Sequence, residues 1–390
     1  MEDSGSLAKI GRPTVLIIEN SIDLTGALKS ITRTSYDLSS YFTFKFLVPR
    51  KARGRFWIEM AGFTDIIELP FRELSRRPLG IMLYIPNLIR NAVRLKRILR
   101  RENVSLIHLN DVYNMLPVAC RLLGMGTPYV CHVRFLPDRF PKLLFNAWLN
   151  LHLKFAYKII AVSQSVKAQL PVHPKITVIH NEAPLEELLP YVRPDLRSSH
   201  PYKFLYLSNF IEGKGQQFAL TAFSHIHASL PDWKLRFVGG DMGMRKNKIY
   251  RERLIAAANK LGVADKVEFE EFVADVEREY KNADIVLNFS ESESFSFTCL
   301  EALFYGSPLI ASDSGGPSEI IDNYQTGILV PNKNIEKMQK AMFDLASDVN
   351  LRASYSSKAR IVVRERFSIN NTSYRLKNIY DDATRRLTNT

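Results

Sequence analysis

The stretch NFSESESFSFTCLEALFYGSP, residues 288–308, joins an apolar strand to a helix and places two carboxylates around the turn. Glu293 follows the strand, and Glu301 lies one to two turns into the helix. Ser296, Phe297 and Thr298 occupy the first turn of that helix, where unpaired N–H groups and a partial positive charge favour a phosphate. The stretch therefore indicates a site for a phosphorylated ligand whose hydroxyls the two carboxylates would bind.

Spacing alone leaves two other interpretations of this pair of carboxylates. A glycosidase also uses paired carboxylates, separated by roughly 5–9.5 Å. A fully helical step of eight residues covers ~12 Å, which the turn could shorten. Alternatively, Glu293 is a solvated loop charge and Glu301 a charge on the surface of a helix.

Strands and helices alternate on both sides of this stretch, which predicts an α/β fold of two doubly wound parallel sheets. Ligands of such sheets bind beyond the carboxyl ends of the strands, so a cleft between the two domains is expected. The segment 182–202 contains four prolines and interrupts the alternation, so it is the candidate linker. The expected strands are 14–18, 42–49, 65–70, 104–110, 127–134, 158–163, 175–181, 203–209, 234–240, 266–272, 284–290, 307–312 and 327–331, and the helix before residue 104 is expected at 87–103.

The composition indicates how many packed cores the chain can form and in which cellular compartment we expect the protein. With 390 residues, 46% of them hydrophobic, the chain is long enough for two packed cores. Three cysteines, Cys120, Cys131 and Cys299, provide no disulfide framework and favour a reducing compartment. No run reaches the ~18–20 apolar residues of a membrane span. We expect a cytoplasmic protein, either free or peripheral on the inner face of the membrane.

The net charge of +13 is concentrated in the first half of the chain, where residues 1–200 carry +12 and residues 201–390 carry +1. This excess predicts an acidic partner: anionic lipid headgroups, a phosphorylated acceptor or nucleic acid. Nucleic acid is disfavoured because no helix-turn-helix, zinc-finger or RNA-binding signature is present. The cations of segments 49–57 and 87–101, the first of which contains Phe56 and Trp57, suit either a solvated surface or an anionic membrane.

Residues 290–331 closely resemble the nucleotide-sugar-binding region of the family 4 retaining glycosyltransferases. That family's pattern is roughly S-x-x-E-G-F-G-x-x-x-x-E-A-x-x-x-G-x-P-V-I-x-x-x-x-G-G-x-x-E, followed by T-G-x-L-V. The positions in register are Ser290, Glu293, Phe295, Glu301, Ala302, Gly306, Pro308, Gly315, Gly316, Glu319, Thr326, Gly327 and Val330.

The resemblance implies a role for each matching position. Glu301 would bind the ribose of the donor nucleotide, and Glu293 would bind hydroxyls of the donor sugar. The N–H groups of Ser296, Phe297 and Thr298 would hold the diphosphate. Lys214, in the sequence EGKG, would bind the diphosphate as well. No D-x-D motif follows a strand, so neither a metal nor another cofactor is implied, and lysine and helix-terminus charge would stabilise the leaving group.

The sequence departs from the family pattern at several positions. Asn209 stands where the family has an arginine that binds the diphosphate, and Ser294 and Ser296 replace two glycines. The N-terminal glycine loop is reduced to Gly26. Asn209 and Gly26 remain candidate donor-binding residues at these positions, and Arg245 or Lys246 are candidates to replace the missing cation.

Strand-end residues of the first half are candidates for the acceptor side. His132 and Arg134, in PYVCHVRF, alternate along one strand and so share a face. The family often has a histidine at the position of Arg134, which implies contact with the sugar or acceptor; a structural role for the pair is equally open. His108, Asn110 and Asp111 end the neighbouring strand, where a structural role is favoured for each alone.

The resemblance implies a GT-B architecture with an acceptor domain at 1–190, a nucleotide-sugar domain at 191–367 and a helix at 368–390 that crosses back to the first domain. It implies a retaining, metal-independent hexosyl- or related glycosyltransferase that uses a nucleotide-diphosphate sugar and a glycan or lipid-linked acceptor, in cell-surface polysaccharide or lipopolysaccharide synthesis. Two alternatives remain: a non-catalytic subunit that binds glycan or a partner enzyme, and a sugar-nucleotide epimerase of the same fold.

Overall fold

The computed structural model describes residues 11–71, 78–184, 201–273 and 275–388. The chain divides into two compact units, each assembled from more than one segment of the sequence. The predicted boundary after residue 190 and most of the predicted linker at 182–202 lie outside the described residues. The first unit comprises Met1–Ala161, Val172–Ile179 and Ser373–Thr390, and the second comprises Val162–Pro171 and His180–Thr372.

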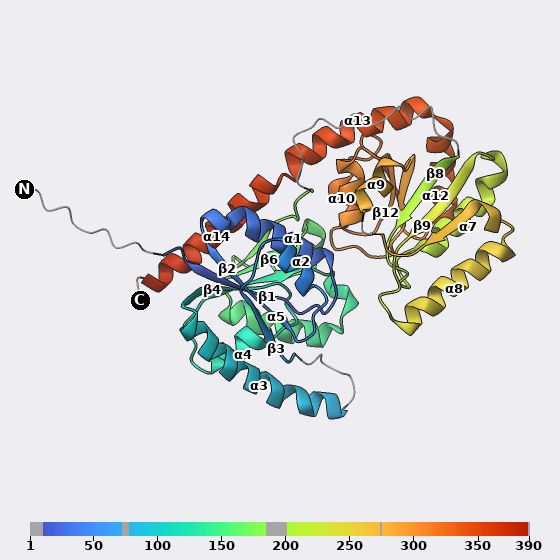
Figure 1. Cartoon of the computed structure of the whole chain (residues 1–390). Helices are drawn as coiled ribbons and strands as arrows, with labels where there is room; N and C mark the ends of the chain where they lie inside the picture. The colour runs from blue at the N-terminus through green and yellow to red at the C-terminus, as the bar shows by residue number, and fades with distance from the viewer. Residues whose placement is uncertain (1–10, 72–77, 185–200, 274, 389–390) are drawn as a thin grey trace, which may run out of the picture. The chain divides into compact units, whose positions relative to one another are not determined.

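Seven parallel strands form the sheet of the first unit in the order β3-β2-β1-β4-β5-β6-β7 (Figure 1). The order reverses between β1 and β4, which makes their carboxyl ends the topological switch point where ligands of such sheets bind. The strands are β1 (Thr14–Ile18), β2 (Thr43–Pro49), β3 (Ile66–Leu69), β4 (Val104–Leu109), β5 (Tyr129–Val133), β6 (Lys158–Ala161) and β7 (Ile176–Val178).

Helices cover both faces of this sheet, so its central strands are apolar runs that are buried almost completely. Helix α3 begins nine residues earlier than predicted and continues through Pro86. Proline removes one helical hydrogen bond, but Pro86 is exposed and its ring displaces no packed neighbour. The helices of eight or more residues before the linker are α1 (Gly26–Asp37), α3 (Pro78–Arg101) and α5 (Lys142–Phe155), and the shorter ones are α2 (Arg55–Met60) and α4 (Leu116–Leu122).

The C-terminal helix α14 (Ile369–Thr388) completes the core of the first unit. Leu376, Tyr380 and Ala383 are buried in the same hydrophobic cluster as residues of β1 and β2. The ring of Tyr380 meets Phe42 edge-on at 5.4 Å between centroids. A segment more than 190 residues beyond β7 therefore supplies part of this core.

The second unit has a six-stranded parallel sheet in the order β10-β9-β8-β11-β12-β13, with its switch point between β8 and β11. Its strands are β8 (Tyr202–Leu207), β9 (Trp233–Val238), β10 (Val267–Glu270), β11 (Ile285–Asn288), β12 (Leu309–Asp313) and β13 (Ile328–Pro331). Its helices are α6 (Gln164–Ala168), α7 (Gln216–Ile226), α8 (Arg245–Lys260), α9 (Val276–Lys281), α10 (Phe297–Phe304), α11 (Pro317–Ile320), α12 (Ile335–Ser347) and α13 (Val349–Arg366).

Among the helices that the structure describes, none combines the length and the apolar character needed to cross a bilayer.

Candidate active site

The N-terminus of helix α10 follows β11 at the switch point of the second sheet. Ser296 caps this helix: its hydroxyl accepts hydrogen bonds from the N–H of Cys299 at 3.3 Å and from the side-chain amide of Asn288 at 3.0 Å. Within the described part of the chain, the N–H groups of Ser296, Phe297 and Thr298 donate to no protein acceptor. Three donors at one helix end are thus available to an anion.

Ser296 retains the backbone conformation for which its family position normally carries glycine. Its φ is 84°, a value that costs a residue with a Cβ about 1–2 kcal/mol. The serine hydroxyl offsets part of this cost through the capping bonds to Cys299 and Asn288. Ser296 therefore adopts a positive φ, which glycine favours, although it carries a side chain.

Glu293 is held by the loop that contains the G-G-x-x-E motif. Its N–H donates to the carbonyl of Ser314 at 3.0 Å, and its carbonyl accepts from the N–H of Gly316 at 2.8 Å. A Cβ on Gly316 would lie 2.2 Å from the Cα of Phe295, so only glycine allows this approach. The Glu293 carboxylate accepts a hydrogen bond from the ammonium of Lys214 at 2.7 Å. The structure thus brings two predicted site residues into direct contact.

The loop of Lys214 is fixed against the end of β11. The hydroxyl of Tyr206 donates to the carbonyl of Lys214 at 2.5 Å. The flanking glycines, Gly213 and Gly215, have φ values of 92° and 82°. A Cβ on Gly215 would lie 1.9 Å from the carbonyl oxygen of Phe289, whereas one on Gly213 would meet nothing within 4 Å. Close backbone contact on one side therefore sets the direction of the lysine.

Glu301 is half-buried in α10 and accepts a hydrogen bond from the hydroxyl of Tyr280 at 3.1 Å. Burial and the Glu301 carboxylate raise the pKa of Tyr280 well above its usual value, so this tyrosine remains a donor. Tyr280 could not be identified as a site residue from the sequence, because a tyrosine at helical spacing carries no signal of its own. The bond orients the carboxylate that the family resemblance assigns to ribose.

Asn209 has a structural partner where the family places a cation. Its side-chain oxygen accepts a hydrogen bond from the N–H of Gly240 at 3.2 Å, which ties the loop after β8 to the loop after β9. A Cβ on Gly239 would lie 2.0 Å from the carbonyl oxygen of Ser208, so the two loops are in close backbone contact. Arg245 and Lys246, the candidate replacements, are exposed at the start of α8.

Glu319, matched in the family pattern but given no role from the sequence, caps helix α6. Its carboxylate accepts hydrogen bonds from the N–H groups of Gln164 at 2.7 Å and Ser165 at 2.6 Å, and from the ring of His180 at 3.0 Å. Burial alone would raise its pKa, but these hydrogen bonds outweigh burial and lower the pKa of Glu319. Its role is therefore structural within the second unit.

In the first unit, the strand-end candidates form one hydrogen-bonded chain. Arg134 contacts His132 Nδ1 at 3.3 Å and donates to the Asn110 side chain at 2.8 Å. His132 Nδ1 lies 2.8 Å from His108 Nε2, and His108 Nδ1 lies 2.5 Å from the Tyr380 hydroxyl. The strand ends of β4 and β5 are thereby connected to α14, a link that nothing in the local sequence signals.

The direction of these hydrogen bonds follows from chemistry. Arginine can only donate, so His132 Nδ1 is an acceptor, and His108 Nε2 carries the proton shared with it. Tyr380 then donates to His108 Nδ1. Burial and the charge of Arg134 lower the pKa of both histidines well below the usual value, so both rings are neutral. The proton of His132 is therefore on Nε2, which makes this atom a hydrogen-bond donor.

The remaining candidates of the first unit organise the loop after β1. Glu19, buried at the end of that strand, accepts hydrogen bonds from the N–H groups of Asn20 at 2.9 Å and Ser21 at 2.8 Å, and from the Asn110 amide. Gly26 is the first residue of α1 beyond this loop. The Asp111 carboxylate accepts from the N–H of Val112 at 2.9 Å, within its own turn.

Two doubly wound parallel-sheet units, each with polar residues beyond the carboxyl ends of its central strands, are the architecture of the GT-B fold. The protein-family model described as Glycosyltransferase Family 4 matches residues 60–187, and the family model described as Glycosyl transferases group 1 matches residues 192–362. The chain therefore belongs to glycosyltransferase family 4.

Similar proteins agree with this assignment. An uncharacterized glycosyltransferase of Methanocaldococcus jannaschii is 28% identical over 240 residues, which are 57% of this chain and 59% of the relative. The chain spans about half the length of the curated relatives it matches. The Anabaena protein HepE, solved with UDP-glucose, has a TM-score of 0.74 at 18% identity and covers 97% of this chain and all of its own. The lipopolysaccharide outer core galactosyltransferase WaaB has a TM-score of 0.71 at 18% identity over 95% of this chain and 99% of its own.

Proposed function

We propose that this protein transfers a sugar, with retention of configuration, from a nucleotide-diphosphate sugar to a glycan or lipid-linked acceptor. The observation that carries the proposal is the contact between Lys214 and Glu293 beside the free N–H groups of α10. A cation and a helix N-terminus suit a diphosphate, and a carboxylate suits sugar hydroxyls. HepE, which has the same fold, was solved with UDP-glucose.

In this proposal the donor is held by groups of the second unit. Glu301, oriented by Tyr280, accepts hydrogen bonds from the ribose hydroxyls. The diphosphate lies on the N–H groups at 296–298, and Lys214 turns from Glu293 toward it. Lysine and helix charge stabilise the leaving diphosphate, so no metal ion is required. Glu293, released from the lysine, accepts hydrogen bonds from the donor sugar.

The first unit provides the acceptor side. The acceptor hydroxyl attacks on the face of the leaving group, and its proton passes to a phosphate oxygen of the donor, so no protein nucleophile takes part. His132 carries its proton on Nε2 and therefore acts as a hydrogen-bond donor to substrate, not as a general base. Tyr380, His108 and Arg134 hold that ring in place.

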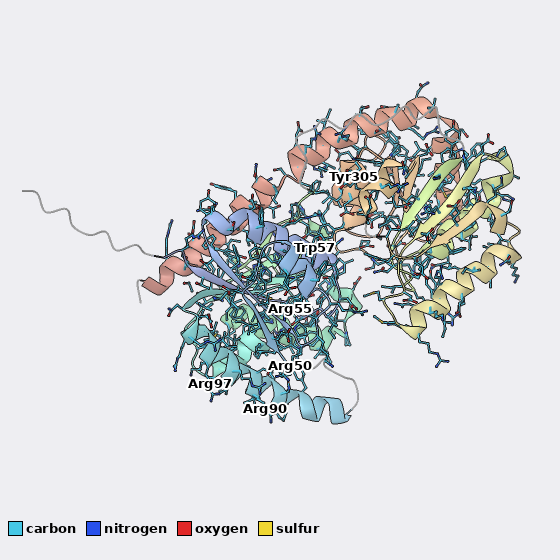
Figure 2. The ribbon with its side chains drawn as sticks, in the orientation of Figure 1. Arg50, Arg55, Trp57, Arg90, Arg97 and Tyr305 are labelled. Carbon is cyan, nitrogen blue, oxygen red and sulfur yellow. The ribbon has the colours of Figure 1, made fainter. Side chains whose placement is uncertain are left out.

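An anionic membrane surface is the proposed location of the acceptor, in cell-surface polysaccharide or lipopolysaccharide synthesis. Ile85, Ile89 and Val93, spaced by four residues, form an exposed apolar stripe on α3. Arg90 and Arg97 extend from the same helix (Figure 2), which gives it the combination of apolar and basic groups that interfacial helices use. The 49–57 segment contributes less, because Arg55 is paired with Glu59 and Glu68.

A non-catalytic subunit of the same fold is the second candidate. Asn209, bonded to Gly240, occupies the position of a family arginine, and loss of one charged contact to the diphosphate would cost ~1.5–3 kcal/mol. Such a subunit would bind a nucleotide sugar or glycan without releasing nucleotide diphosphate. An epimerase of this fold would return an isomerised nucleotide sugar, with no net release of nucleotide diphosphate and no sugar on the acceptor.

Calorimetry with a panel of nucleotide sugars tests the donor site. Glu301→Ala should weaken binding about tenfold or more, because a ribose hydroxyl loses a charged acceptor. Glu365→Ala, at an exposed position on α13, is the matched control and should bind as the unmodified chain does. Equal affinity of both variants would contradict the donor site. NMR of the product tests retention, because the transferred sugar should keep the anomeric configuration that it has in the donor.

A further inference from the structure

The first unit contains a pocket of about 640 Å³ at the edge of its sheet opposite the strand-end candidates. Pro128 precedes β5, Tyr157 precedes β6 and Pro174 precedes β7, and all three line this pocket. In a parallel sheet the amino ends share one edge, so the pocket is remote from Arg134 at the carboxyl end of β5. We call it the basal pocket; its charged lining residues are Arg121, Lys154, Lys158, Lys175 and Asp382.

Backbone carbonyls hold three of the four cations of the basal pocket. Arg121 donates to the carbonyls of Met125 and Gly126, both at 3.0 Å. Lys158 donates to the carbonyl of Pro174 at 2.9 Å, and Lys175 donates to that of Leu153 at 2.7 Å. These bonds fix the positions of the charges without neutralising them.

The fourth cation, Lys154, lies over the ring of Phe155, 5.2 Å from its centroid. Among the described residues, none of the four cations forms an ion pair, and Asp382 is the single carboxylate that lines the pocket. Burial and the nearby guanidinium of Arg121 lower the pKa of Lys175. The ammonium is thus held where its charge is unfavourable in the absence of an anion.

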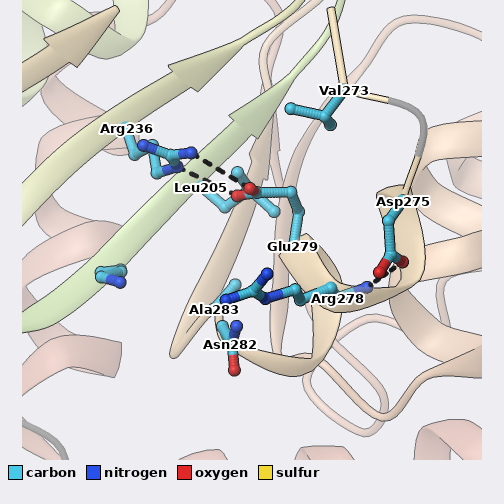
Figure 3. A pocket seen from close by; sticks show the side chains of 9 residues that line it. Leu205, Arg236, Val273, Asp275, Arg278, Glu279, Asn282 and Ala283 are labelled. Carbon is cyan, nitrogen blue, oxygen red and sulfur yellow. Dashed lines mark hydrogen bonds and ion pairs between the residues drawn. The ribbon is translucent and has the colours of Figure 1, made fainter. Parts of the chain in front are cut away.

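A pocket of about 370 Å³ in the second unit shows the opposite arrangement (Figure 3). There the guanidinium of Arg236 is paired with Glu279 at 3.0 Å and with Glu268 at 3.1 Å. Arg236, which lines this pocket, is thus neutralised by carboxylates of the protein itself. The basal pocket differs in having four cations around a single carboxylate, with no ion pair to any of the four among the described residues.

We propose that the basal pocket binds the phosphate of a small phosphorylated molecule. A phosphate monoester carries about two negative charges at neutral pH and three acceptor oxygens, which matches several fixed N–H donors. Phe155 and Tyr157 give the pocket partly apolar walls, which suit the organic part of such a molecule. The ligand is a soluble phosphate monoester or the headgroup of a phosphomonoester lipid, and this site is separate from the donor site of the second unit.

Hydrogen exchange by mass spectrometry on the whole chain can locate the binding. Glycerol 3-phosphate is titrated at low salt, and peptides covering 121–128, 153–158 and 172–176 are followed. Peptides covering 290–304 report any binding at the donor site in the same experiment. Lys154→Gln/Lys158→Gln is the test variant, and Lys142→Gln/Arg375→Gln, which removes two exposed cations elsewhere in the unit, is the control.

Slower exchange in the three basal peptides, with an apparent Kd raised about tenfold or more in the test variant and unchanged in the control, supports the proposal. Protection by vesicles containing phosphatidic acid, but not by glycerol 3-phosphate or by phosphatidylcholine vesicles, also supports it and assigns the lipid source. Lys154→Gln alone, which removes no carbonyl contact, repeats the test if the double variant unfolds. No protection by either probe, or equal protection by sodium chloride at the same ionic strength, overturns the proposal.

Discussion

The ammonium of Lys214 lies 2.7 Å from the carboxylate of Glu293, although 79 residues separate the two in the sequence. The lysine follows β8 and the glutamate follows β11, the two strands between which the order of the second sheet reverses. The side chain of Glu293 is 14% exposed and that of Lys214 is 34% exposed, so the pair is partly shielded from water. A donor diphosphate would therefore compete with a carboxylate for this lysine.

Replacing the glycines around Lys214 should separate backbone strain from steric contact. Both Gly213 and Gly215 have positive φ, so alanine at either position should cost about 1–2 kcal/mol of unfolding free energy. Only Gly215 touches Phe289, so Gly215→Ala should cost about 1–3 kcal/mol more than Gly213→Ala and should weaken nucleotide-sugar binding. Urea unfolding and calorimetry of the two variants measure both effects, and equal stability of the pair would contradict the close contact.

Acid should destabilise the first unit through its buried histidines. The pKa values of His108 and His132 are lowered by burial and Arg134, and burial lowers that of His152 to about 4. The unfolded chain takes up protons below about pH 6.5 while the folded unit does not, so stability is present above that pH and falls below it. Each histidine contributes up to about 1.4 kcal/mol per pH unit.

Urea titration with hydrogen-exchange readout on β4 and β5 at pH 7 and pH 5.5 measures this loss. Strands β8 and β9 contain no histidine and serve as the internal comparison. If the midpoint for β4 and β5 is the same at both pH values, the histidines are not neutral in the folded chain.

Charge reversal on α3 should weaken binding to anionic vesicles. Each cation near such a surface contributes about 1 kcal/mol to the free energy of membrane binding. Arg94, Arg97 and Arg101 should therefore contribute measurably, although Arg101 also contacts Glu102. The full-length chain with all three arginines replaced by Glu should bind anionic vesicles more weakly. Binding of the unmodified chain should weaken with added salt, because the Debye length falls from ~10 Å at 0.1 M to ~3 Å at 1 M. Nucleotide-sugar affinity should not change.

The matched control reverses three exposed cations on α8 of the second unit, Lys248, Arg253 and Lys260. Co-sedimentation with vesicles that decreased equally in both triple variants would show that net charge, not the surface of α3, is responsible.

Turnover should be the same in excess chelator and in magnesium. The proposed stabilisation of the leaving diphosphate comes from Lys214 and the N–H groups of Ser296, Phe297 and Thr298, none of which needs a metal ion. Release of nucleotide diphosphate, followed in both conditions with one preparation, gives the comparison. Activity that disappears with chelator and returns with magnesium would refute this expectation.

The parallel α/β architecture was predictable from the sequence because alternating strands and helices need no information about distant contacts. Strand β1 lies where it was predicted, and the other strands differ by a few residues at their ends. Helix α3 was predicted too short, because proline usually marks a helix boundary and the exposed position of Pro86 could not be known.

The candidate site was predictable only in part. Glu293 and Lys214 were identified from motifs, but their contact depends on the order of β8 and β11. Tyr280 and Tyr380 were missed because their partners, Glu301 and His108, are distant in the sequence and each tyrosine resembles an ordinary core residue.

The position of α14 has a consequence for the order in which the protein is made. Tyr380 and Ala383 fill the core of the first unit, yet the ribosome adds them only after the whole of the second unit. The second unit can complete its own core first, while the apolar surface of β1 and β4 remains exposed. The first unit, although its strands are synthesised first, is therefore the last to complete its core. Until then, its exposed apolar surface is the natural target for a chaperone.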